Sequence, residues 1–303
     1  MFTNNGPSDP WFQWLTHRRH GGDEKYEKTV RVMVDAIRNR VLDGARFSPG
    51  QVLVDVGAGD GLIAFGAFER AGPSLKAVFT DISSPLLERA EKLAVERGLR
   101  EQCSFINTSA EELSGIADQS ADVVTCRAVL TYVADKGKAL KQFYRVLKPG
   151  GRISIGEPIN RDDALSLAAL TRYLESQPND EANAPARLYQ RWRSSQLPST
   201  KEEILRHPAT SFTERDYFRL CRLVGFHEIH LELHMDDRKL SIESWEVFLN
   251  IAPRPDTPTL REVLENTFTA DERGPFEARL RQLFEAGFFR ESDVVAYLTA
   301  LRP

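Results

Sequence analysis

An acidic residue followed by three alternating glycines stands in the stretch VLVDVGAGDG, residues 52–61. The G-x-G-x-G spacing differs from the G-x-G-x-x-G turn of dinucleotide-binding proteins, because Leu62 occupies the place of the last glycine. A P-loop would end in Gly-Lys-Ser/Thr, and no such sequence follows here. Asp55 would repel a pyrophosphate and attract an α-ammonium group. Glycines let a ligand approach the backbone closely. The N-terminus of the next helix favours a carboxylate. The loop therefore favours a zwitterionic amino-acid group over a phosphate.

A second acidic residue, Asp81, follows the next apolar run, in the stretch FTDIS. A carboxylate at the end of that strand can accept hydrogen bonds from both hydroxyls of an unphosphorylated ribose. Capping of the helix that begins near Ser83 is an alternative role, and the two are compatible. Ser109-Ala110-Glu111 comes after a third apolar run, where the edge of an adenine would lie.

The elements that must position these residues alternate between strand and helix patterns. Repeated strand–helix units predict a parallel sheet with helices on both faces. The polar loop between the apolar runs 226–233 and 244–251 predicts an antiparallel hairpin. The last fifty residues read as three helices, the third over 292–301, which could be a lid, a dimer surface or plain packing. The expected strands of the repeated units are 52–56, 77–81, 103–107, 121–126 and 152–156, and the expected helices are 62–71, 84–98 and 136–147.

Taken together, VDVGAGDG, FTDIS, TSAEEL, ADVVTCRAVLTYV and YRVLKPGGRISIGEP resemble the class I S-adenosylmethionine-dependent methyltransferases. The resemblance is greatest to the branch that modifies small molecules, including quinone-biosynthesis methyltransferases, and it spans about residues 50–160. It implies an α/β fold: a Rossmann-like, seven-stranded, mostly parallel sheet with an antiparallel C-terminal hairpin. Helical N-terminal, insertion and C-terminal segments would be added to this sheet.

The resemblance also implies a role for each matching position. The methionine part would be held at the glycine loop, the ribose by Asp81 and the adenine by the residues after it, with Cys126 lining the floor near the sulfur. Ser109 stands where the family usually has aspartate, so the adenine contact would be weaker or made by Glu111. The implied cofactor-binding residues are Asp55, Gly57, Ala58, Gly59, Asp81, Ile82, Ser109, Ala110, Glu111 and Cys126.

Three domains are expected: an N-terminal arm and helix (1–49) that caps the cofactor site, a methyltransferase domain (50–253) and a helical extension (254–303). Within the second, an insertion at 157–211 would cover the substrate site. A hydroxyl acceptor benefits from a base, and His17, His20 and Glu157 are the candidates. A basic surface patch is the alternative for the two histidines, and a substrate contact or orientation of the insertion is the alternative for Glu157.

Composition narrows the function classes. A formal net charge of -4 argues against a protein that coats nucleic acid. The sequence has no run of 18 apolar residues, so no membrane span is expected. It also lacks the pattern of a secretory signal. Three scattered cysteines offer neither disulfides nor a metal site, and His230 and His234 lie about 13 Å apart along a strand, too far to share one ion. A cytoplasmic protein is expected.

The leading hypothesis is transfer of a methyl group from S-adenosylmethionine, leaving S-adenosylhomocysteine, to an O or N atom of a small-molecule acceptor. The expected partners are that acceptor and a second copy through the C-terminal helices, with no nucleic acid and no membrane. The alternatives are an RNA or protein methyltransferase and a non-catalytic S-adenosylmethionine-binding regulatory protein.

Overall fold

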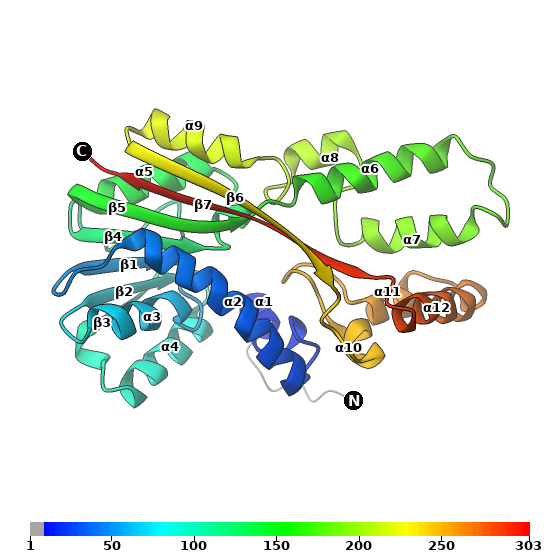
Figure 1. Cartoon of the computed structure of the whole chain (residues 1–303), viewed down its shortest axis with the longest axis horizontal. Helices are drawn as coiled ribbons and strands as arrows, with labels where there is room; N and C mark the ends of the chain where they lie inside the picture. Colours follow the sequence, from blue (N-terminus) through cyan, green and yellow to red (C-terminus); the bar gives the residue numbers. More distant parts are fainter. Residues whose placement is uncertain (1–8) are drawn as a thin grey trace. The chain divides into compact units, whose positions relative to one another are not determined.

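A seven-stranded sheet in the order β3-β2-β1-β4-β5-β7-β6 organises the computed structural model, which describes residues 9–303 (Figure 1). The first five strands pair in parallel, and β7 pairs antiparallel with β5. The predicted mostly parallel sheet with an antiparallel C-terminal pair of strands is therefore confirmed. The strands are β1 (Val52–Val56), β2 (Lys76–Asp81), β3 (Cys103–Asn107), β4 (Ala121–Arg127), β5 (Leu147–Pro158), β6 (His227–Lys239) and β7 (Arg290–Leu301).

The chain divides into two compact units. The sheet-bearing unit comprises residues 32–159, 212–234 and 294–303, and the helical unit comprises the remainder. The helices associated with the first are α2 (Glu24–Ala45), which begins in the helical unit, α3 (Leu62–Ala71), α4 (Ser84–Glu96), α5 (Lys136–Val146) and α9 (Glu214–Val224), with short turns η2 (Arg100–Gln102) and η3 (Leu130–Tyr132).

Each face of the sheet carries its own apolar core, because side chains alternate along a strand. Val54 and Val56 of β1 pack in one cluster with α5 and α9. Leu53 packs in the other with α3, α4 and the end of α2. Burial on both faces explains why the parallel strands are nearly continuous apolar runs.

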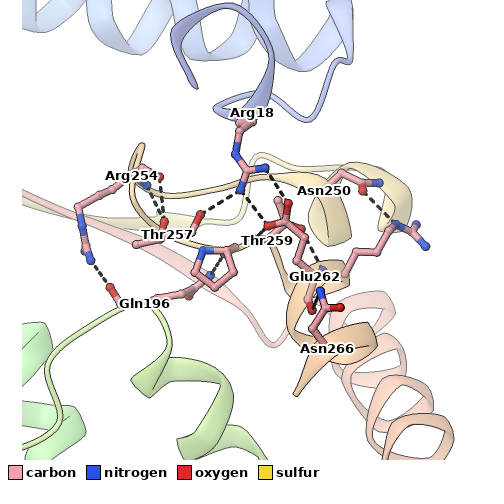
Figure 2. Close-up of polar contacts among 10 residues, drawn as sticks. Arg18, Gln196, Asn250, Arg254, Thr257, Thr259, Glu262 and Asn266 are labelled. Carbon is pink, nitrogen blue, oxygen red and sulfur yellow. Dashed lines mark hydrogen bonds and ion pairs between the residues drawn. The ribbon is translucent and has the colours of Figure 1, made fainter. Parts of the chain in front are cut away.

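The described part of the helical unit consists of residues 9–31, 160–211 and 235–293. Arg18 of its N-terminal segment makes a bidentate ion pair with Glu262, at 2.7 and 2.8 Å, and also donates to the carbonyl of Thr257 (Figure 2). Trp14 Nε1 donates to the carbonyl of Ala252. The elements of this unit are α1 (Pro10–Gln13), the π-helix η1 (Trp14–Arg18), α6 (Arg161–Glu175), α7 (Ala184–Ser194), α8 (Lys201–Arg206), α10 (Trp245–Asn250), α11 (Leu260–Asn266) and α12 (Ala270–Glu285).

Two expected elements were wrong. Residues 244–251 form helix α10 rather than a strand, with Ser244 as N-cap and with Trp245 and Phe248 in the aromatic core of the helical unit. Residues 292–301 form β7 rather than a helix, and their alternating side chains fit between β5 and β6. The second strand of the C-terminal pair thus comes from the chain end. The capping box at Thr269 does open α12, as expected.

Candidate cofactor site

The glycine loop follows β1 and requires glycine for steric reasons. Gly57, Gly59 and Gly61 all have positive φ, at 64°, 57° and 88°, a region that side chains disfavour. A Cβ on Gly57 would lie 2.1 Å from Cγ2 of Val129, and one on Gly61 would lie 2.4 Å from the ring of Phe65. Ala58 is buried, and its N–H donates to the carbonyl of Thr80 on β2. The loop is therefore tightly packed between neighbouring strand ends.

Asp55 is buried beneath this loop. One carboxylate oxygen accepts a hydrogen bond from Thr125 Oγ1 at 2.8 Å, and the other accepts from the N–H of Ala64, in the first turn of α3, at 3.2 Å. Burial raises the pKa of Asp55 to about 7, against the lowering effect of these two hydrogen bonds. The carboxyl group thus ties β1 to β4 and α3, and a cation bound at the loop would favour its charged form.

Asp81 connects the glycine loop to the second strand end. Its two carboxylate oxygens accept from the N–H groups of Gly59 and Ser83, each at 2.9 Å. Each carboxylate oxygen can accept more than one hydrogen bond, so these contacts are compatible with acceptance from ribose hydroxyls. The N-cap of α4 is Ser83, so Asp81 supports the cap residue instead of being the cap. The next side chain, Ile82, is 56% exposed, which suits a residue expected to pack on an adenine.

The segment after β3 lies beside this strand end. The Asn107 side-chain amide donates to the carbonyl of Asp81 at 2.9 Å. Ser109 is half-buried and its carbonyl accepts from the first turn that follows, while Ala110 is packed in the core. The Glu111 carboxylate accepts from the N–H of Asp135 at 3.1 Å. Adenine contacts by these residues remain predictions.

Glu157 is fully buried at the end of β5. Its carboxylate oxygens accept from the N–H groups of Val129 (3.0 Å) and Thr131 (2.9 Å). Cys126, also fully buried, donates its thiol to Glu157 at 3.4 Å. Burial raises the pKa of Glu157 while the backbone hydrogen bonds lower it, and burial raises the pKa of the Cys126 thiol well above its usual value. Glu157 therefore positions the loop at 128–131, against which Gly57 packs.

The two candidate histidines belong to the helical unit. His17 is exposed, with Nδ1 2.7 Å from Thr16 Oγ1. His20 is buried, its Nε2 lies 2.9 Å from the carbonyl oxygen of Thr16, and its Nδ1 has no hydrogen-bond partner in residues 9–303. Their described contacts are local, and their role as bases remains a prediction.

Several supporting residues were not identified from the sequence. Thr125, the hydrogen-bond partner of Asp55, lies in the quoted stretch ADVVTCRAVL, and a hydroxyl in an otherwise apolar buried strand is a usable signal. Ala128, with φ of 52°, is a strained non-glycine residue at the end of β4. Val129 has no sequence signal for its contact with Gly57. Each of the three acts by shaping the strand ends around the loop.

Within residues 9–303, no group of three or more His, Cys, Asp or Glu side chains could hold a metal ion. The helices of the same residues include none with the length and apolar character needed to cross a bilayer.

The strand order and the carboxylate-braced glycine loop define a Rossmann-like methyltransferase. The chain belongs to the family described as a methyltransferase domain, whose model matches residues 47–205, just over half of the 303 residues. The matched residues contain all of the motifs that resemble the class I S-adenosylmethionine-dependent methyltransferases. When bound, S-adenosylmethionine supplies an activated methyl group, and the strand-end residues described above fit its amino-acid and ribose parts.

Particular relatives agree with this assignment. Ubiquinone/menaquinone biosynthesis C-methyltransferases of Brucella anthropi and Bradyrhizobium diazoefficiens are 38% identical over 104 and 122 residues, which are 34% and 40% of this chain. The matches span only 39% and 47% of those relatives. The solved YcgJ protein of Bacillus subtilis has the same fold, with a TM-score of 0.54, 19% identity, and coverage of 88% of this chain and 98% of that one.

Proposed function

We propose that this enzyme transfers the methyl group to an O or N atom of a small-molecule acceptor. The main support is that Asp81 accepts a hydrogen bond from the glycine loop and that Ile82 beside it is exposed. These two residues could then contact the ribose and the adenine of an adenosyl group whose ribose carries no phosphate. The names of the relatives, which act in quinone biosynthesis, support a small acceptor.

Transfer is an in-line displacement, so the protein must mainly position the acceptor and exclude water. In this proposal the N-terminal arm (1–49) and the insertion (157–211) cover the acceptor, although the first eight residues of the arm lie outside the described structure. His17 and His20 are the proposed bases for a hydroxyl acceptor. For Glu157, the buried hydrogen bonds favour a positioning role over direct proton transfer.

A second candidate is transfer to carbon. Both relatives named above are C-methyltransferases, and each is 38% identical to this chain over the matched part. A carbon acceptor must be an electron-rich ring or enolate, and a base would then act on that ring system.

The test is incubation of the protein with methyl-labelled S-adenosylmethionine and a whole-cell extract, which is then separated into small molecules, RNA and protein. Label in small molecules supports the proposal, and label confined to RNA or protein refutes it. The ¹³C chemical shift of the transferred methyl distinguishes O, N and C products. Asp81→Ala should abolish turnover and cofactor binding, whereas Glu112→Ala, an exposed acid in the same unit, should retain both.

A further inference from the structure

A cavity of about 350 Å³ lies within the sheet-bearing unit, lined by residues of α2, β5, β6 and β7 and by Arg46. Its wall includes Arg152, which precedes Glu157 by five residues on β5. Glu157 lies at the end of the strand that faces the candidate cofactor site. That separation is about 16 Å at roughly 3.3 Å per residue. The cavity is thus distinct from the cofactor site.

Small residues let α2 pack closely against the sheet beside this cavity. A Cβ on Gly44 of α2 would lie 2.6 Å from both Ser154 Oγ and Thr299 Cγ2, so α2 can approach the sheet here only with glycine. Ser154 and Thr299 face each other in the register of β5 and β7 and lie on the same side as Arg152. Ser154 donates to the carbonyl of Val41 at 2.6 Å. The floor is therefore small, polar and rigidly held.

The acidic residues of the wall already have partners. Asp43 pairs with Arg70 at 2.6 Å. Glu232 pairs with Arg40 at 2.7 Å and also contacts His230 and His234, at 3.1 and 3.0 Å. Hydrogen bonds with His234, His230 and Arg40 lower the pKa of Glu232 to about 2. These carboxylates are therefore committed to other cations.

Two arginines of the wall are left without such partners. Within the described residues, neither Arg46 nor Arg152 makes a side-chain hydrogen bond or an ion pair. Burial lowers the pKa of Arg152, the neighbouring charge of Arg46 lowers it further, and Glu228 only partly offsets these effects by raising it. Two guanidinium groups that line the same cavity thus repel each other.

Simple structural roles do not account for both arginines. Arg46 follows the last residue of α2, where a cation complements the helix dipole. Arg152 comes from a strand, is half-buried, and has no comparable role. An anion between the two would relieve their repulsion and use the planar, paired N–H groups that suit phosphate oxygens.

We propose that this cavity binds a small phosphate-bearing anion between Arg46 and Arg152. The volume suits a small molecule. Ser154, which is 1% exposed and bonded to Val41, shapes the floor, so the two arginines provide the contacts to the ligand. This site is independent of the methyl acceptor and of the proposed function.

The experiment is calorimetric titration of the full chain with inorganic phosphate and, separately, with ribose 5-phosphate, at constant ionic strength set by chloride. Wild-type protein should show saturable binding to one site. Arg46→Gln and Arg152→Gln should each weaken it about tenfold or more, as expected for loss of a charge-assisted contact. Tighter binding of the ester supports a metabolite as ligand, and equal binding supports the free ion.

The matched control is Arg89→Gln, which removes an exposed arginine of α4 in the same unit and should leave phosphate binding unchanged. S-adenosylhomocysteine affinity should also be unchanged in the two cavity variants, since the sites are separate. Absence of saturable phosphate binding, or an equal loss in Arg89→Gln, would overturn the proposal. If Arg152→Gln does not fold, the exposed Arg46→Gln variant still provides the test.

Discussion

Cofactor binding should release a proton from Asp55. In the free protein burial raises the pKa of this carboxyl to about 7, from an ordinary value of 3.8. The α-ammonium group of the cofactor, bound at the adjacent glycine loop, would favour the carboxylate and bring its pKa down. Affinity should therefore rise with pH across the range around 7, because the ionised form binds more tightly.

The magnitude follows from linkage. With a pKa near 7 in the free enzyme and near 4 in the complex, the ionised fraction of the free enzyme rises from about 0.09 at pH 6 to about 0.9 at pH 8. The dissociation constant should fall about tenfold over the same interval. At pH 7, about half a proton should be released for each cofactor bound.

The assay is calorimetric titration with S-adenosylhomocysteine at pH 6, 7 and 8, in two phosphate-free buffers of different ionisation enthalpy. The buffer dependence of the heat gives the number of protons released. Asp55→Asn should remove both the pH dependence and the proton release, whereas Glu88→Gln, an exposed acid of α4, should keep them. Equal wild-type affinities at pH 6 and pH 8, with no proton released, would refute the reasoning.

Ionisation of Asp55 should favour cofactor binding but lower the stability of the folded protein. Because the folded pKa of Asp55 is raised, the native state binds more protons than the unfolded state between about pH 4 and 7. The free energy of unfolding should therefore fall as pH rises through that window, by at most about 4 kcal/mol from this group. Urea unfolding of wild type and Asp55→Asn at several pH values measures the difference.

Three further substitutions test contacts inside the sheet-bearing unit or inside the helical unit. Gly57→Ala should abolish cofactor binding and lower the melting temperature, because its Cβ would meet Val129 at 2.1 Å and its φ is positive; near-native affinity by titration would contradict this. Glu157→Gln should cost about 2–4 kcal/mol in urea unfolding, because an amide N–H would face backbone donors, and a loss below 0.5 kcal/mol would argue against a positioning role. Arg18→Met should cost only about 1 kcal/mol, since its ion pair with Glu262 is partly exposed; prior loss of Glu262 should remove that cost in a double-mutant cycle.

The parallel strands and β6 could be predicted from local patterns, and β7 could not. Strands such as Val52–Val56 are short apolar runs between turn residues, and their partners lie in the next repeated unit. The run at 292–301 contains both helix-forming and β-branched residues, and its partner is Arg152–Pro158, far away in sequence. Long-range pairing decided this element. The run at 244–251 was ambiguous in the same way, and packing of Trp245 and Phe248 selected a helix.

The candidate site was predictable to the level of its acidic residues but not of their partners. Asp55, Asp81 and Glu157 were all identified, yet sequence alone could not show which donors each one meets. Asp81 accepts from the glycine loop itself. Glu157 accepts from the loop at 128–131, whose backbone N–H groups carry no sequence signature. The role of a carboxylate is set by those donors, so it becomes visible only in three dimensions.

The three carboxylates join adjacent strand ends into one rigid edge. Asp81 links the loop after β1 to the start of α4, Asp55 links β1 to β4, and Glu157 links β5 to the loop after β4. Asp81 is the most exposed of the three, at 8% against 1% for Asp55 and 0% for Glu157, so it is the best placed to meet a ligand. Asp55 and Glu157 are almost inaccessible, so they act on a ligand through charge and position. Substitution of Asp81 should therefore impair binding directly, whereas substitution of Glu157 should impair stability and binding together.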